Sequence, residues 1–330
     1  MQLINIQSPE EMAQFTLHPA VSRTTATQLT LHRPDAHWLA VDDGRQVLGR
    51  CSLWWKATAT HNDHRLGYIG HYAAASDPVA EKLLNRASTD LSQNGCTLAV
   101  GPLDGTTWRR YRFITWRGKA PPFFLEPDNP DAWPGQFEKN GFSILADYIS
   151  TLNTDLNYQD PRAEEISRRM EDQGVCIRCI DPDHLDRELD GIFELSIESF
   201  RKNFLYSPIE RKEFMAMYGG VKSFLHGELT LVAEQQGRTV GFMFALPDAL
   251  QAKRGQRIDQ VILKTIAIRP DRALAGLGRL LFQTALSNAH KLGYRRAVHA
   301  LMHAANRSTN LGQGSTVVMR RYALFSKELV

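Results

Sequence analysis

The segment from Ile258 to Leu292 constrains the fold of this chain strongly, because an apolar run gives way to a helical pattern within a few residues. From Val261 to Ile268 the residues are apolar almost without alternation, which is typical of a strand buried on both faces. Pro270 then ends the strand, and Gly293 is a typical helix stop. The segment therefore predicts a strand, a turn and a helix whose apolar face carries Leu277, Leu280, Leu281, Ala285 and Ala289.

Two glycines, Gly276 and Gly278, lie where this helix begins. Glycine lacks a Cβ, so backbone N–H groups there can approach an anion, and the unpaired donors of a first helical turn favour phosphate. The third glycine of a dinucleotide fingerprint is absent, since position 281 is Leu281, and so is the Gly-Lys-Ser/Thr of a P-loop. The loop therefore predicts a phosphate site of another kind. The alternative is a helix whose small residues only allow close packing.

Length and composition set the broad class. With 330 residues, of which 43% are apolar, we expect two globular domains. The chain has no apolar run approaching the ~18 residues of a membrane span, and it begins without the basic-then-apolar pattern of a signal peptide. We therefore expect a cytoplasmic protein with no membrane partner. The net charge of +3 does not by itself predict nucleic-acid binding.

The CxxC spacing of Cys176 and Cys179 is one that zinc and redox sites use. The surrounding sequence, VCIRCI, reads as a strand, in which positions three apart point to opposite faces. The chain has no second CxxC pair to complete four zinc ligands. We therefore predict no metal site.

The order of predicted elements repeats along the chain at an offset of about 195 residues. Residues 37–56 read as two strands joined at an Asp43-Gly44 turn, and residues 229–248 read the same way. In each half a further strand, a helix and another strand follow. Two copies of one α/β unit explain this order.

The segment 268–278 resembles the pyrophosphate loop of the GCN5-related N-acetyltransferases, which follows a strand ending Val-x-Pro and reads (Arg/Gln)-x-x-Gly-x-(Gly/Ala). Ile268-Arg269-Pro270 stands at the strand end, and Gly276 and Gly278 take the last two defined positions. Ala273 departs from the pattern, with Arg272 one residue early. The resemblance implies an α/β fold of two tandem acetyltransferase-like domains, each a mostly antiparallel twisted sheet flanked by helices.

The segment 153–162 is polar and turn-rich and predicts a boundary between domains at 1–157 and 158–330, with the cofactor loop in the second. Where the first copy would need glycines, residues 75–80 have none, and Asp77 falls near the expected pyrophosphate. The segment 129–142 is similar to a late helix of the family, with Phe137 in place of a tyrosine. We therefore expect a degenerate first domain and one cofactor site.

For function, the resemblance implies acetyl transfer from acetyl-CoA to a primary amine by direct attack, without an acyl-enzyme. The acceptor would be a small molecule or a peptide, and the sequence does not predict an oligomeric state. The alternative is a non-catalytic CoA-sensing or interaction module built from two degenerate copies. The family's cofactor contacts correspond to Ile266, Ala267, Ile268, Leu274, Ala275, Gly276, Leu277, Gly278, Arg279, Asn306 and Ser308.

Neither of the family's two proton-transfer positions carries its usual residue. The position of the basic glutamate falls on Ile262, and that of the tyrosine falls near Gln313. His303 or Asp259 could replace the base. Tyr322 could replace the acid, because an ordinary tyrosine pKa of about 10 suits a departing thiolate. For each of these three residues the alternative is a purely structural role, without part in proton transfer.

Two further segments combine aromatic and polar residues. Asn203, Phe204 and Tyr206 lie between two predicted helices and would form a wall of the acceptor cleft in the family's fold; the alternative is a helix-hairpin core. The segment 108–119 interleaves basic and aromatic residues, which suits single-stranded nucleic acid or a phosphorylated small molecule. A strand with one solvated arginine face explains it equally well. Nucleic acid is not the expected partner, because basic residues are not enriched elsewhere.

Overall fold

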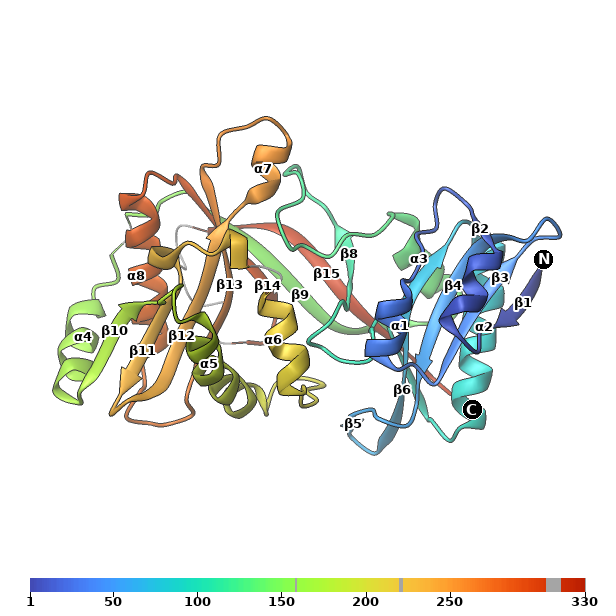
Figure 1. Ribbon diagram of the computed structural model, residues 1–330, viewed down its shortest axis with the longest axis horizontal. Coiled ribbons are helices and arrows are strands. Elements are labelled where there is room, and N and C mark those ends of the chain that lie inside the picture. The colour runs from blue at the N-terminus through green and yellow to red at the C-terminus, as the bar shows by residue number, and fades with distance from the viewer. Residues whose placement is uncertain (158, 220–221, 307–315, 330) are drawn as a thin grey trace.

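The structure, a computed structural model, describes residues 1–157, 159–219, 222–306 and 316–329 (Figure 1). The molecule is elongated, with a first half from β1 to β9 at one end and a second half from α4 to β14 at the other. Two long strands, β9 (Ser143–Asn153) and β15 (Thr316–Glu328), run between the two ends.

The first half consists of short and long strands with three α-helices. Its elements before β9 are β1 (Gln2–Asn5), η1 (Pro9–Gln14), β2 (Thr16–Leu17), α1 (Ala26–His32), β3 (Ala36–Val41), β4 (Gln46–Trp54), β5 (Thr60–His61), β6 (His64–Ala74), α2 (Asp77–Gln93), β7 (Leu98–Gly101), β8 (Phe113–Trp116) and α3 (Ala132–Lys139).

The second half repeats the pattern of two antiparallel strands, a third strand, a helix and a strand parallel to the third. Its elements are α4 (Ala163–Asp172), β10 (Val175–Cys179), α5 (Leu185–Phe200), α6 (Arg211–Gly219), η2 (Lys222–Phe224), η3 (Gly227–Leu229), β11 (Leu231–Gln235), β12 (Arg238–Pro247), α7 (Ala249–Lys253), β13 (Gln260–Ile268), α8 (Leu277–Lys291) and β14 (Arg296–His303).

One continuous sheet runs through both halves in the order β1-β3-β4-β6-β7-β15-β9-β14-β13-β12-β11-β10. Neighbours in this order are antiparallel except for two parallel pairs, β6 with β7 and β13 with β14. The mixed α/β class and the repeated unit predicted from the sequence are therefore confirmed. In the described part of the chain, no helix is both long and apolar enough to cross a membrane.

The two halves exchange their last strands. β7 of the first half pairs with β15, which comes from the end of the chain, and β14 of the second half pairs with β9. β9 and β15 also pair with each other, from Asn153↔Thr316 to Ser143↔Ser326. Each half therefore completes its sheet with a strand from the other half, as the crossing of β9 and β15 in Figure 1 shows.

Helices cover both faces of the sheet in the second half, which explains why β13 is apolar on both faces. On one face, α4 and α8 bury Val261 and Leu263 of β13. On the other face, α5 and α6 bury Ile262. The strand therefore contributes side chains to two cores, and this double burial favours the near-continuous apolar run seen in the sequence.

Candidate functional site

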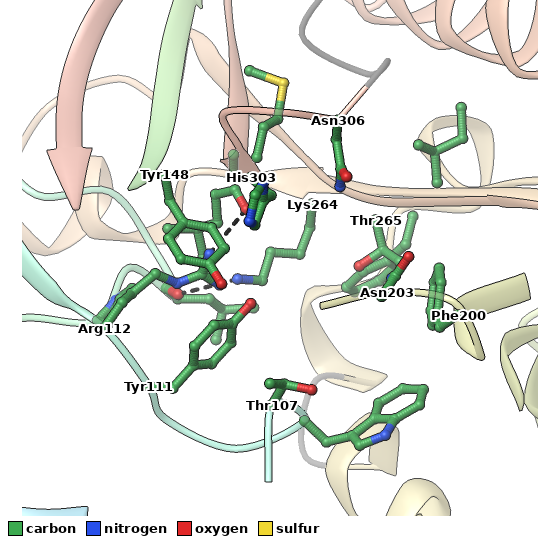
Figure 2. A pocket seen from close by; sticks show the side chains of 18 of the residues that line it. Thr107, Tyr111, Arg112, Tyr148, Phe200, Asn203, Lys264, Thr265, His303 and Asn306 are labelled. Carbon is green, nitrogen blue, oxygen red and sulfur yellow. Dashed lines mark hydrogen bonds between the residues drawn. The ribbon is translucent and has the colours of Figure 1, made fainter. Parts of the chain in front are cut away.

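A cavity opens where the two parallel strands of the second half separate. β13 and β14 pair from Gln260↔Arg296 to Leu263↔His299, and among the described residues no further pair follows. β13 nevertheless continues to Ile268 and β14 to His303. A cavity of about 700 Å³ lies at this point (Figure 2).

Both halves build the walls of this cavity. The first half contributes residues 107–112, residues 125–127 and Tyr148 of β9. Two contacts hold the segment before Leu125 against the second half. Phe123 is buried in the core of the second half, and the Phe124 N–H donates to the Asp248 carboxylate at 2.9 Å. The walls are mainly aromatic and apolar, and include Trp108, Tyr111, Tyr148, Phe200, Phe204, Tyr206, Phe244, Ile266 and Leu301.

Lys264 is the one charged residue between Val261 and Ile268, and its side chain points into the cavity (Figure 2). An irregularity in the pairing of β12 with β13 directs the Lys264 side chain into the cavity. Phe244 of β12 opposes Thr265 and the next residue opposes Leu263, so Lys264 has no partner on β12. Such bulges turn a side chain away from the regular alternation of a strand. The amino group lies 3.5 Å from the carbonyl oxygen of Leu125.

The cavity lowers the pKa of Lys264 to about 7. Desolvation by the surrounding walls is the largest cause, the positive charge of Arg112 adds to it, and the carboxylate of Glu126 opposes it. A large fraction of this amine is therefore unprotonated near neutral pH and can accept a proton. The family pattern does not point to Lys264. The signal in the sequence is a lone lysine within an apolar strand.

His303, a predicted base, lines the cavity at the end of β14. Its ring meets Tyr148 edge-on, with centroids 5.0 Å apart, and its pKa is lowered by burial and by Arg112. The Ala305 N–H donates to Nδ1 at 3.1 Å, so the neutral imidazole carries its proton on Nε2. In this geometry Nε2 is a hydrogen-bond donor, and a base role for His303 is disfavoured.

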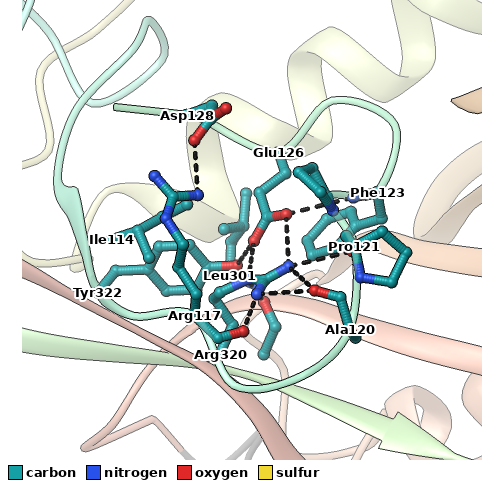
Figure 3. A network of polar contacts seen from close by, with 12 residues as sticks. Ile114, Arg117, Ala120, Pro121, Phe123, Glu126, Asp128, Leu301, Arg320 and Tyr322 are labelled. Carbon is teal, nitrogen blue, oxygen red and sulfur yellow. Dashed lines mark hydrogen bonds and ion pairs between the residues drawn. The ribbon is translucent and has the colours of Figure 1, made fainter. Parts of the chain in front are cut away.

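Tyr322, the predicted acid, is fully buried in a network behind the cavity and does not line it (Figure 3). Its hydroxyl donates to Glu126 at 2.6 Å and lies 3.0 Å from the Ser150 hydroxyl, which accepts the Leu301 N–H. Burial and the Glu126 carboxylate raise its pKa well above the ordinary value. Tyr322 therefore supports the cavity-lining strand at Leu301, and its placement corrects the expected role in thiolate protonation.

The same network contains a buried ion pair. Arg320 and Glu126 meet at 2.7 Å, with side chains 1% and 0% exposed. Arg320 also donates to the backbone carbonyls of Arg117, Ala120 and Pro121 (Figure 3). These bonds satisfy the buried guanidinium, and they attach the segment 117–126 of the first half to β15.

Asp259, the other predicted base, lies at the far end of β13, just before Gln260. Its carboxylate accepts hydrogen bonds from Arg296 at 2.6 Å and from Gln251 at 2.7 Å. It does not line the cavity. The geometry thus gives Asp259 a structural role, in place of the predicted chemical one.

The segment 108–119 forms part of the cavity wall and is a strand only at Phe113–Trp116. Two of its arginines, Arg109 and Arg112, are engaged within the protein. Arg109 pairs with Glu213 at 2.6 Å, and Arg112 lies over the rings of Tyr111 and Tyr148, 3.9 and 4.3 Å from their centroids. For these two arginines the arrangement matches neither a solvated face nor a surface open to nucleic acid.

The glycine loop begins after the end of β13. Gly276 caps α8 with a φ of 93°, in the left-handed region, and an added Cβ would lie 3.1 Å from the Ile166 side chain. Among the described residues, neither the Gly276 nor the Gly278 amide has a hydrogen-bond acceptor. Both amides can therefore donate to an anion at this helix start.

The other predicted contacts fall into three groups. The acceptor-wall residues Asn203, Phe204 and Tyr206 line the cavity, together with the predicted cofactor contacts Ile266 and Asn306. Ser308 lies outside the described residues. The remaining predicted cofactor residues surround the glycine loop without lining the cavity: Ala267, Leu274 and Leu277 are buried, Ala275 is exposed, Ile268 contacts Gly278, and Arg279 pairs with Asp160.

The first half has a corresponding pair of parallel strands, β6 and β7, which also separate. There, however, the segment that follows β7 fills the space between them. β6 and β7 pair as far as Tyr68↔Val100. Beyond that point the Leu103 N–H donates to the Ile69 carbonyl at 2.9 Å, and the Asp104 carboxylate accepts the His71 N–H at 2.6 Å. The strand edge beside this gap in the first half is thus occupied by the segment that follows β7.

The chain resembles a curated protein in sequence and several solved structures in fold. No family model matches the chain. The bacterial ceramide synthase of Caulobacter vibrioides (strain NA1000 / CB15N) is 25% identical over 276 residues, which cover 76% of this chain and 71% of that protein. Among solved structures, a GCN5-related N-acetyltransferase from Anabaena variabilis has a TM-score of 0.54 at 9% identity, covering 100% of this chain and 73% of the other.

A tandem GNAT protein from the clavulanic acid biosynthesis pathway has a TM-score of 0.50 at 11% identity, covering 100% of this chain and 99% of that one. These likenesses and the repeated sheet confirm the fold that the sequence resemblance implies. The chain has the fold of the GCN5-related N-acetyltransferases, in its tandem form.

Proposed function

We propose that this protein transfers an acyl group from an acyl-CoA thioester to the amine of an amphiphilic acceptor. The observation that supports this most directly is the cavity at the separating ends of β13 and β14, with the Lys264 amine inside it. Amide formation requires that a thioester and an amine be held together, that an oxyanion be stabilised and that a proton be removed. The residues around this cavity can supply all three.

The cofactor would lie along β13 from the glycine loop to the cavity. The Gly276 and Gly278 amides and the positive end of α8 would hold the pyrophosphate. The thioester would then reach the cavity beside Thr265 and Ile266, which line it. Backbone N–H groups from Ile266 to Ile268 are candidates for the oxyanion donors.

Lys264 would move the proton. The lone pair of the acceptor nitrogen attacks the carbonyl carbon of the thioester. The unprotonated amine of Lys264 accepts the proton that this nitrogen loses. A C–N bond forms, the C–S bond breaks, and the resulting Lys264 ammonium returns the proton to the departing CoA thiolate. One side chain therefore serves as base and then as acid, so neither Tyr322 nor Asp259 is needed.

The size and the lining of the cavity favour long apolar chains. A volume of about 700 Å³ lies well within the range of roughly 300–1,000 Å³ that encloses drug-sized ligands. The acetyl group predicted from the family resemblance would fill a small part of it. The relative from Caulobacter is named a ceramide synthase, and a ceramide is an amide of a long-chain acyl group with a long-chain amino alcohol. We therefore favour a long-chain donor, a long-chain amine, or both.

The test is to incubate the purified chain with palmitoyl-CoA and sphinganine, following thiol release and the mass of the product. We expect amine-dependent thiol release with formation of the N-acyl product, and faster turnover than with acetyl-CoA and the same amine. Lys264→Met should lower turnover by roughly 100-fold or more. Lys291→Met, at the exposed end of α8, is the matched control and should leave the rate unchanged.

Two results would contradict the proposal. Thiol release that does not depend on the amine would indicate thioester hydrolysis. CoA binding with no turnover for any donor and amine would instead favour the CoA-sensing module considered from the sequence.

A further inference from the structure

A second cavity, of about 450 Å³, lies in the first half against α6 of the second half. Its walls come from the segment before α1, from β4 and β6, and from the residues that follow β7. Arg109, Arg110 and Met217 line both this cavity and the larger one. The acyl-transfer proposal does not use it.

A chain of buried hydrogen bonds ends at this cavity. His37 Nδ1 lies 2.6 Å from the Ser52 hydroxyl, which lies 2.9 Å from His71 Nδ1. His71 Nε2 in turn lies 2.8 Å from Nδ1 of His32, which lines the cavity. Burial is the main cause that lowers the pKa values of His32, His37 and His71, to about 4, 3 and 2, so all three imidazoles are neutral near pH 7.

The direction of donation along this chain follows from its buried end. Donation from His32 toward His37 would leave a proton on His37 Nε2, which is buried and has no partner among the described residues. A buried N–H without an acceptor is costlier than a ring nitrogen without a donor. The favoured direction therefore runs from His37 to His32. It leaves the His32 proton on Nε2, as a donor at the cavity.

The charged side chains around the cavity are unbalanced. Four guanidinium groups line it against two carboxylates, those of Asp104 and Glu213, and both carboxylates are already engaged. Asp104 accepts the His71 N–H at 2.6 Å, and Glu213 binds Arg109 through both oxygens, at 2.6 and 3.0 Å. The lining arginines, which leave an excess of positive charge, are Arg23, Arg50, Arg109 and Arg110.

Thr24 adds a further donor. Its side chain lines the cavity and is 2% exposed, and its hydroxyl has no hydrogen-bond partner among the described residues. A buried hydroxyl without a partner is destabilising, so such a group is typically matched by a ligand or an ordered water.

We propose that this cavity binds a small anion, a molecule carrying a phosphate or carboxylate group. The surplus guanidinium charge, the Thr24 hydroxyl and the His32 N–H would together hold the anionic oxygens. The site uses neither the glycine loop nor Lys264, although Arg109, Arg110 and Met217 line both cavities.

The experiment is calorimetric titration of the full chain with inorganic phosphate, methyl phosphate and citrate, at ionic strength held constant with chloride. We expect one saturable site per chain. The probe with the highest affinity shows whether the site prefers a phosphate or a carboxylate group. Thr24→Val keeps the shape of the side chain and removes only the hydroxyl, so it should fold at least as stably while weakening binding about tenfold. Arg110→Gln should weaken binding to a similar degree, because it removes one of the surplus charges.

Two controls locate the site. Arg168→Gln removes an exposed arginine of α4 and should leave binding unchanged, and Gly278→Asp should also leave it unchanged because it alters only the glycine loop. Failure of all three probes to saturate would overturn the proposal. A loss in Gly278→Asp, or unchanged affinity in Thr24→Val, would equally overturn it by placing the anion elsewhere.

Discussion

Lys264 owes its properties to a single irregularity in an otherwise apolar strand. The bulge in β13 turns the side chain into the cavity, and desolvation there lowers its pKa to about 7. A lysine with an ordinary pKa of about 10.4 would be protonated at neutral pH and unable to accept a proton. Position and reactivity therefore have one structural origin.

The pH dependence of turnover should report this lysine. Because the base form predominates above its pKa, kcat/KM should rise with pH through about 7 and then level off. Lys264→Met should lower kcat by roughly 100-fold or more and remove this rise of kcat/KM with pH, the acidic limb of the profile. His303→Gln should leave the limb in place, since Nδ1 of His303 already accepts a backbone N–H. A limb that disappears in His303→Gln instead would assign the base to the histidine.

Tyr322 should prove to be a structural residue. Tyr322→Phe removes the donor to Glu126 and the partner of Ser150, so the free energy of unfolding should fall by about 1–3 kcal/mol. Turnover should change little once the variant is folded. Urea unfolding measures the first quantity and thiol release the second. A tenfold loss of kcat with unchanged stability would return Tyr322 to the mechanism.

At the scale of elements, the sequence predicted those that depend on local pattern. Helix α8 begins next to Gly276 and ends at Lys291, just before the predicted stop at Gly293, and both β-hairpins form at the expected turns. The bulge at Lys264 could not be predicted, because it depends on which residues of β12 lie opposite. The closing of the first-half gap by Leu103 and Asp104 likewise depends on contacts that no local pattern encodes.

The glycine loop can be tested by adding one methyl group. Gly276→Ala forces alanine into a φ of 93° and brings its Cβ to 3.1 Å from Ile166. We expect the free energy of unfolding to fall by about 1–2 kcal/mol, because left-handed backbone is costly for alanine, and CoA affinity to fall with it. Gly135→Ala in α3, where an added Cβ meets nothing within 4 Å, is the control. Equal effects of the two substitutions would contradict this account of the loop.

At the scale of the whole molecule, the strand exchange makes the halves interdependent. The proposed domains, 1–157 and 158–330, each lack the strand that borders β7 or β14 in the intact sheet. Each domain expressed alone should therefore be poorly folded by circular dichroism and prone to aggregate, because a strand edge is left unpaired. Co-expression of the two should restore a folded complex. An independently stable second domain that binds CoA would contradict this.

We propose one acyl-CoA site per chain, in the second half where β13 and β14 separate, because in the first half the segment after β7 occupies the corresponding strand edge. Calorimetric titration of the full chain with CoA tests this most directly. The account predicts one site per chain, lost in Gly278→Asp, whose carboxylate would face the pyrophosphate. Two equivalent sites, no binding at all, or a single site that survives Gly278→Asp would contradict it.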